Sequence, residues 1–151
     1  MKKELIQELF KKFEEACYDL DGLECWSARE LMSVFSYSEW RAFSTLIKKA
    51  SETCKNAGEK VEDHFVVYYK MVELGSGAQR KIEDVALTRY ACYLVAQNGN
   101  PSKQEIAFAQ TYFAVQTRKQ ELIEQRLLDI ARVNAREKLS KSEKKIIRNN
   151  L

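Results

Sequence analysis

The sequence has few of the residues that interrupt secondary structure, with one proline and five glycines among 151 residues. No linker-like stretch or internal repeat divides it, so we expect one domain over residues 1–151. No apolar run approaches the roughly 20 residues that a membrane helix needs, so we expect no membrane-spanning helix and no membrane partner. The first fifteen residues mix lysine with glutamate and lack the apolar core of a signal peptide.

The four cysteines lie far apart, at Cys17, Cys25, Cys54 and Cys92, and none forms a CxxC pair. Zinc sites and disulfide frameworks usually have closer or patterned spacing. Cys54 and Cys92 stand among apolar residues with helical spacing. We therefore expect free thiols in a reducing cytoplasm, with no metal and no cofactor.

Catalytic motifs are absent from the chain. His64 is the single histidine, and no nucleophile motif accompanies it. The glycine-containing loop at residues 75–77 lacks the Walker spacing of a nucleotide-binding loop. Only Glu73, Glu83 and Asp84 are acidic residues that flank the expected sheet, which is weak support for a metal-dependent nuclease. We expect a protein that is not an enzyme.

Charge is unevenly distributed along the chain. Residues 132–151 carry seven basic and two acidic residues, whereas residues 1–131 carry 18 basic and 20 acidic residues. A basic end suits contact with nucleic acid or another anionic partner. The alternative, slightly favoured for so modest a charge, is a solvated helix end.

The first third of the chain predicts a helix followed by a tight turn. Apolar residues recur at helical spacing over residues 2–17, with lysine and glutamate opposite. Asp21 and Gly22 are a strong turn signal between two short extendable runs. The two runs are residues 16–20 and 23–26. Either they form a small hairpin, or only the second run forms a short strand.

Two helices are predicted next, each from a capping signal. Ser27 and Glu30 fit the Ser-x-x-Glu capping box and start a helix over residues 28–35. After a brief break, Ser38 is expected to cap a longer helix over residues 39–56. Such a pair is similar to a helix-turn-helix, although two-helix corners are also common in domains that do not bind DNA.

The middle of the chain predicts the sheet. Residues 64–74 are rich in aromatic and β-branched residues and form the best strand. The loop at residues 75–81 follows, and residues 82–87 form a short antiparallel return strand. Together with the first hairpin this gives a small antiparallel sheet of two or three strands.

A helix pair completes the fold. Thr88 caps the first helix and Gly99 closes it, while Pro101 suits the first position of the second helix. The second helix is apolar nearly all round at its start, so it should be buried, and it runs over residues 101–138 as the spine. A further capping box at Ser140 opens a short terminal helix. The fold class is α+β, mostly α-helical, with a small antiparallel β-sheet and a long central and C-terminal helix.

The later part of this helix carries a short apolar stripe of Ile123, Leu127 and Ile130, continued by Asn134. The stripe spans only about two heptads, fewer than the three or four that indicate a coiled coil. It suits either packing against residues 2–17, which is slightly favoured, or a homodimer through the C-terminal helix.

Two blocks of the sequence resemble the DNA-damage-inducible protein D family of bacteria. One is WSARELMSVFSYSEWRAFSTLIKKA at residues 26–50, and the other runs from Asp63 through KMVELGSGAQRKIEDVALTRYACYLVAQNGNPSKQEIAFAQTYFAVQTRKQE. More distantly, both blocks are similar to the Bro-N domain of viral and phage proteins. Ser36 departs from the glycine that usually precedes the tyrosine in those domains.

The resemblance implies a single Bro-N-like domain, with a basic helical extension at about residues 122–151. It implies a cytoplasmic bacterial protein of the SOS and DNA damage response that binds DNA. Family members generally continue beyond residue 151, so we expect this chain to correspond to their N-terminal portion. The alternative is a protein-interaction module that modulates a recombination or DNA repair protein.

The residues that we expect to contact DNA are basic and stand on exposed helix faces, on the loop before the return strand, or beside the helix pair. They are Arg41, Lys48, Lys49, Arg80, Lys81, Arg89, Lys103, Arg118 and Lys119. Lysine and arginine would neutralise phosphates, so binding should weaken steeply with salt. Exposed tyrosines would stack on bases, although tyrosines at these spacings are more often in a core.

Overall fold

The computed structural model describes the backbone of residues 2–149 and the side chains of residues 3–143. The chain divides into two units, the first ending at Phe113 and the second beginning at Ala114. The predicted α+β class is confirmed. Within the described residues, every helix is too short or too polar to cross a bilayer.

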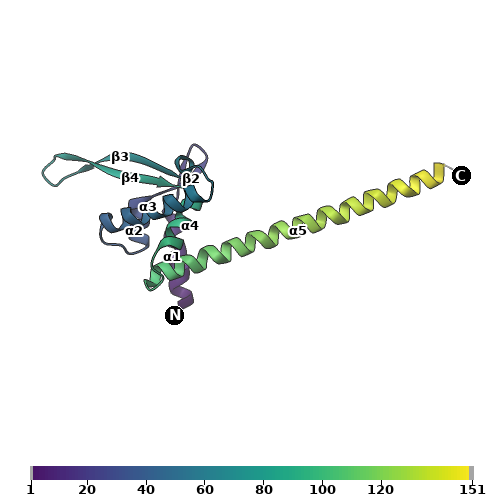
Figure 1. The fold of residues 1–151 in the computed structure, drawn as a ribbon, viewed down its shortest axis with the longest axis horizontal. Helices are drawn as coiled ribbons and strands as arrows, with labels where there is room; N and C mark the ends of the chain where they lie inside the picture. The colour runs from purple at the N-terminus through teal and green to yellow at the C-terminus, as the bar shows by residue number, and fades with distance from the viewer. Residues whose placement is uncertain (1, 150–151) are drawn as a thin grey trace. The chain divides into compact units, whose positions relative to one another are not determined.

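The first unit alternates helices with two β-hairpins (Figure 1). Its elements in chain order are α1 (Lys2–Glu15), β1 (Tyr18–Leu20), β2 (Leu23–Ser27), α2 (Ala28–Val34), α3 (Trp40–Asn56), the 3-10 turn η1 (Val61–Asp63), β3 (Phe65–Glu73), β4 (Gln79–Leu87), α4 (Arg89–Asn98) and the start of α5 (Gln104–Asn149).

The sheet has four antiparallel strands in the order β1-β2-β4-β3, one strand more than the largest number expected. Of the two alternatives for residues 16–26, the hairpin is correct. Asp21 and Gly22 both adopt positive φ, +53° and +87°, as a tight hairpin turn requires. The extra connection is the short pairing of Trp26 with Leu87 between β2 and β4. This pairing joins segments far apart in the chain, which local pattern does not reveal.

The hairpin of β3 and β4 extends away from the helices as a two-stranded ribbon (Figure 1). β4 begins at Gln79, three residues earlier than expected, because the ladder continues to the pair of Glu73 with Gln79. Arg80 and Lys81 therefore lie in a strand and not in the loop. Both are exposed.

The core of the first unit lies where the helices meet the base of the sheet. Trp26 is fully buried there and stacks on Phe13, with ring centres 4.7 Å apart. Its indole Nε1 also donates a hydrogen bond of 2.8 Å to the Phe13 carbonyl. α1 and β2 are thus held together both by an aromatic stack and by a satisfied polar group.

Of the N-caps predicted for α2 and α3, the first is present and the second is wrong. The Ser27 hydroxyl accepts a hydrogen bond from the Glu30 amide at 3.4 Å, as the capping box predicts. Ser38 does not cap α3. The N-cap residue is Glu39, whose side chain makes no capping hydrogen bond. The helix therefore begins at Trp40, one residue later than expected, and Arg41 is its second residue instead of its third.

The turn between α4 and α5 differs from its prediction in its second half. Thr88 caps α4 by accepting from the Ala91 amide at 3.2 Å, as expected. Gly99 ends α4 with an ordinary φ of −77°, and a Cβ there would lie 2.9 Å from the Ile106 side chain. Close packing, and not positive φ, requires this glycine. Pro101 lies in a turn before α5, because the Asn100 side chain accepts from the Ser102 amide.

Burial along α5 ends at Phe113, whereas Val115 is exposed, so the expected buried segment is shorter than predicted. In the second unit α5 continues unbroken to Asn149, and no helix starts at Ser140. The apolar stripe that includes Ile123 is exposed. The side chains of the last basic residues of this end, Lys144, Lys145 and Arg148, lie outside the described part.

Candidate nucleic-acid interface

α3 presents a basic outer face. Phe43, Ile47 and Cys54 point into the core, which leaves the opposite side of this amphipathic helix to solvent. Residues 36–56 carry four basic and two acidic residues. Arg41 and Lys48 are exposed on this helix, as the prediction of a DNA-reading helix requires.

The outer face of α3 borders a recess of about 260 Å³ beside the turn between α4 and α5. The recess joins segments that are about 50 residues apart in the sequence. Its lining residues are Tyr37, Ala42, Thr45, Leu46, Lys49, Asn98, Gly99 and Asn100. The structure thus brings Lys49, one of the expected DNA contacts, together with the polar turn at residues 98–100.

Hydrogen bonds hold the polar groups at this recess. The Asn98 amide nitrogen donates to the Leu94 carbonyl at 2.9 Å and lies 3.2 Å from the Thr53 hydroxyl. Lys103 donates to the Ser36 carbonyl at 2.9 Å, and its ammonium group lies 4.9 Å from the centre of the Tyr37 ring. Lys103 is therefore fixed beside the recess by a hydrogen bond and a cation–π contact.

The ribbon offers a second pair of cations. Arg80 and Lys81 are exposed near its tip, and the Lys81 ammonium group lies 4.7 Å from the centre of the exposed Tyr69 ring. Glu73 and Glu83 stand on the same ribbon, so its exposed charge is balanced. The ribbon alone is a weaker attractor for phosphate than the α3 face.

Arg89 takes part in an ion-pair network at the start of α4. It donates two hydrogen bonds to Glu14, at 2.8 and 3.1 Å, and two to Glu24, at 3.2 and 3.4 Å. Its guanidinium also lies over the Trp26 ring at 4.9 Å. The hydrogen bond from Arg89 holds the pKa of Glu14 below its ordinary value, although burial opposes this shift. Arg89 connects α4 to α1 and β2 and has little capacity left for phosphate.

Arg118 and Lys119 belong to the second unit and are exposed. Arg118 lies 3.5 Å from Glu121, three residues along the helix. Of the nine predicted residues, Lys49 and Lys103 thus lie around one recess, with Arg41 and Lys48 on the helix that borders it. Arg80 and Lys81 occupy the ribbon.

Asp84 is a structural centre that the sequence did not reveal. Its carboxylate is fully buried and accepts hydrogen bonds from Ser27, Tyr68 and Lys70, at 2.5, 3.1 and 2.7 Å. It also accepts from the amides of Arg29 and Val85. Burial opposes ionisation, but Lys70 and the other donors outweigh it, so the pKa of Asp84 lies below its ordinary value. The one signal in the sequence was an aspartate beside the apolar run Val85–Ala86–Leu87.

The chemical inventory of the described side chains is small. No group of three histidine, cysteine or acidic residues among them is placed to hold a metal ion. The four cysteines are free, as expected, and Cys25, Cys54 and Cys92 are buried. Burial raises the pKa of the Cys92 thiol well above its ordinary value, so this group is an unreactive part of the core.

Comparison with known proteins gives one family and one curated relative. The model of the BRO family N-terminal domain matches residues 16–114. The chain is 48% identical over 118 residues to the DNA damage-inducible protein D of Escherichia coli (strain K12). This alignment covers 78% of the chain and 43% of the relative, so the chain spans less than half of the relative's length. No solved structure matches.

Proposed function

We propose that the chain, which belongs to the BRO family through its N-terminal domain, is a bacterial accessory protein of the DNA damage response. It binds DNA through a basic surface and catalyses no reaction. The damage response is proposed from the name of its relative, DNA damage-inducible protein D. A cytoplasmic location agrees with the free thiols.

One observation supports DNA binding above the others, namely the recess between α3 and the turn at residues 98–103. Lys49 lines it, Lys103 is fixed beside it, and Arg41 and Lys48 extend the basic face along α3. Asn100 is exposed at the recess and adds an amide group of the kind that contacts phosphate and sugar. The surface therefore has the cations that neutralise phosphates and polar groups that orient the backbone of DNA.

The test is binding of a fluorescein-labelled 30-base-pair duplex, and of the matching single strand, measured by anisotropy at several salt concentrations. Each lost phosphate contact should reduce the slope of log K against log salt by about 0.9 on duplex. The Lys49→Gln/Lys103→Gln double variant should therefore lose nearly two units of slope. The Lys3→Gln/Lys11→Gln double variant, which removes two exposed cations of α1, is the matched control.

Two results would contradict the proposal. One is binding that does not change with salt, because phosphate neutralisation makes salt dependence unavoidable. The other is an equal loss in the Lys3→Gln/Lys11→Gln control, which would show that net charge, and not the α3 recess, determines affinity. Circular dichroism of both variants checks that the fold is retained.

A second candidate function is a protein-interaction module that modulates a recombination or repair protein. Residues 1–131 are close to neutral, and Arg89 is already engaged by Glu14 and Glu24. A pull-down from damaged cells in nuclease-treated lysate separates the two functions, since a DNA-bridged partner is lost and a directly bound partner remains. A metal-dependent nuclease is the least supported class.

A further inference from the structure

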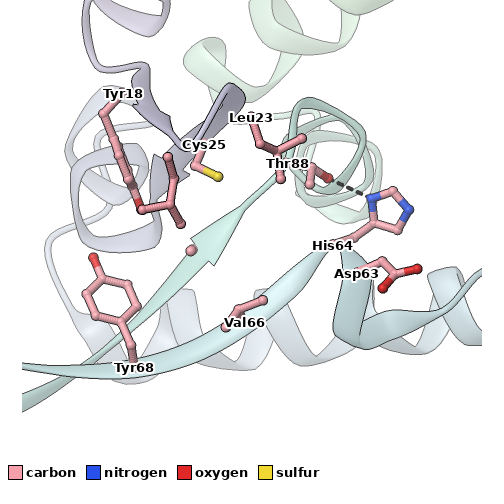
Figure 2. Close-up of a pocket in the computed structure, with 10 residues that line it drawn as sticks. Tyr18, Leu23, Cys25, Asp63, His64, Val66, Tyr68 and Thr88 are labelled. Atoms are coloured by element: carbon pink, nitrogen blue, oxygen red, sulfur yellow. Dashed lines mark hydrogen bonds between the residues drawn. The ribbon is translucent and has the colours of Figure 1, made fainter.

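An apolar groove lies between the β1–β2 hairpin and the ribbon, in the first unit (Figure 2). Its volume is about 370 Å³, which is within the range of ligand-binding sites. The lining side chains are mostly apolar or aromatic: Tyr18, Leu20, Leu23, Cys25, Asp63, His64, Val66, Tyr68, Ala86 and Thr88. None of these residues lines the α3 recess, so this is a separate site.

The rim of the groove exposes large apolar side chains. Leu20, Leu23 and Val66 are 53%, 54% and 49% exposed. The register of the first hairpin pairs Leu20 with Leu23 and Tyr18 with Cys25, so these four residues share one face of the hairpin. A contiguous apolar patch with a concave centre is typical of a surface that binds another molecule.

Tyr18 and Tyr68 form one end of the groove (Figure 2). Their hydroxyl groups are uncharged. The Tyr68 hydroxyl donates to the buried Asp84 carboxylate at 3.1 Å. Burial raises the pKa of Tyr18 to about 12, so its hydroxyl stays protonated near neutral pH. This end therefore presents ring surface and no free charge.

At the opposite end the groove is acidic. Asp63 lines it, and the adjoining turn carries Glu59 and Glu62 against the single cation of Lys60. All three carboxylates belong to exposed residues. The Glu59 carboxylate lies 3.9 Å from Nε2 of His64. A negative potential thus borders the apolar floor on one side.

His64 is held at this end by Thr88, at 2.7 Å from its Nδ1 (Figure 2). The Thr88 oxygen already accepts from the Ala91 amide, so the Thr88 hydroxyl has its own proton available to donate to Nδ1. Nε2 of the same ring faces the Glu59 carboxylate at 3.9 Å.

We propose that this groove binds a segment of a partner protein that carries apolar side chains flanked by lysine or arginine. Charge complementarity decides the partner: an acidic border attracts cations and repels the phosphates of DNA. The volume holds about two benzene-sized groups, since a cavity of about 150 Å³ accepts benzene. The half-exposed rim provides further contact for the neighbouring residues of a peptide. The proposal does not depend on DNA binding at α3.

Fluorescence anisotropy with synthetic peptides tests the proposal on the full chain. The probe is a labelled decapeptide with two leucines flanked by lysines. One matched peptide replaces the lysines with glutamate, and another replaces the leucines with serine. The leucine–lysine peptide should bind at least tenfold more tightly than either, because the site requires both apolar and cationic groups.

Protein variants locate the binding. Leu23→Ser and Val66→Ser change exposed rim residues, so the fold should remain, and each should weaken binding about tenfold. Glu59→Gln with Asp63→Asn should weaken it several-fold, and more at low salt. Leu122→Ser and Glu52→Gln, an exposed apolar and an exposed acidic residue elsewhere, should change it less than twofold.

Three outcomes would overturn the proposal. Equal binding of the glutamate peptide would show a groove without charge preference, as expected for a small apolar ligand or a second copy of the chain. Equal binding of the serine peptide would show charge attraction alone. An unchanged affinity in Leu23→Ser would place the peptide elsewhere. Because Leu23→Ser should leave binding of duplex DNA unchanged, failure here and failure of the DNA proposal are distinguishable.

Discussion

The buried carboxylate of Asp84 should be the most sensitive point of the first unit. Five donors converge on it, from Ser27, Tyr68, Lys70 and the amides of Arg29 and Val85. Through them the ribbon is joined to β2 and to the first turn of α2, where a negative charge also interacts favourably with the helix N-terminus. We therefore expect Asp84→Asn to destabilise the protein strongly.

The magnitude follows from the loss of a buried, paired charge. Breaking such a pair from one side costs about 3–5 kcal/mol. Asparagine keeps the shape of the side chain and one acceptor oxygen, but its NH₂ group faces groups that are themselves donors. We therefore expect the free energy of unfolding to fall by about 3 kcal/mol. Urea unfolding followed by tryptophan fluorescence measures this, since Trp26 adjoins Ser27. With a slope of about 2 kcal/mol per molar urea, the midpoint should fall by roughly 1.5 M.

The pH dependence gives an independent check on this reasoning. The pKa of Asp84 is lowered in the folded protein, so its stabilising contribution is fully present above the unfolded pKa, near 3.9. That contribution is lost as the pH falls below this value toward the folded pKa. The stability difference between the wild type and Asp84→Asn should therefore be constant from about pH 5 to 7 and shrink in acid.

A matched variant on the other side of the ion pair is Lys70→Met. The Lys70 side chain is 36% exposed, and its removal leaves Asp84 with four donors. The loss should be about 1.5 kcal/mol, the lower end of the usual range for a hydrogen bond to a charged group, because Lys70 is partly exposed. If Asp84→Asn costs less than 1 kcal/mol, or if its cost does not shrink in acid, the carboxylate does not hold the ribbon as argued.

Two further predictions concern single contacts. Gly99→Ala should cost about 1–3 kcal/mol in urea unfolding, because the new Cβ would lie 2.9 Å from Ile106, whereas Gly75→Ala, with open space around it, should be nearly neutral. Arg89→Lys keeps the charge but loses the two-pronged hydrogen bond to Glu14, and we expect a loss of about 1 kcal/mol in this partly exposed pair. The pKa of Glu14 is lowered in the folded state, so the Arg89→Lys loss should be present above about pH 4.3 and disappear below it; an unchanged acid transition would contradict this role.

Local chemistry made much of the fold predictable. Ser27 and Thr88 cap their helices as the sequence indicates, because an N-cap depends on residues within one turn. The Asp21–Gly22 turn and the β3 strand follow from local preferences for the same reason. The predictions failed where a second contact competes with the expected one. Pro101 does not start α5, because Asn100 builds a separate local turn with Ser102. Gly99 is required by its packing against the Ile106 side chain and not by its backbone conformation.

The candidate sites were less predictable than the fold, since each depends on pairing between distant segments. Lys49 and Lys103 were both expected to contact DNA, but only the packing of α3 on α4 brings them to one recess. The partners of Arg89 lie 65 and 75 residues away in the sequence. The sequence therefore indicated Arg89 as a DNA contact, whereas in the structure its guanidinium is engaged in ion pairs. The apolar groove depends on the position of β1 opposite β3, which no periodicity indicates.

The two surfaces have opposite charge and are separated by α4. Thr88 at the N-terminal end of α4 lines the acidic apolar groove, and Asn98 at its C-terminal end lines the basic recess. Because α4 has ten residues, it is about 15 Å long. The two sites therefore lie at opposite ends of one rigid helix and do not contact each other. At physiological salt this separation exceeds the screening length of about 8 Å, and the acidic groove should therefore weaken phosphate binding at the recess only slightly. An accessory protein built in this way would hold DNA at one end of α4 and a basic protein segment at the other, so the two proposed functions require different surfaces and do not exclude each other.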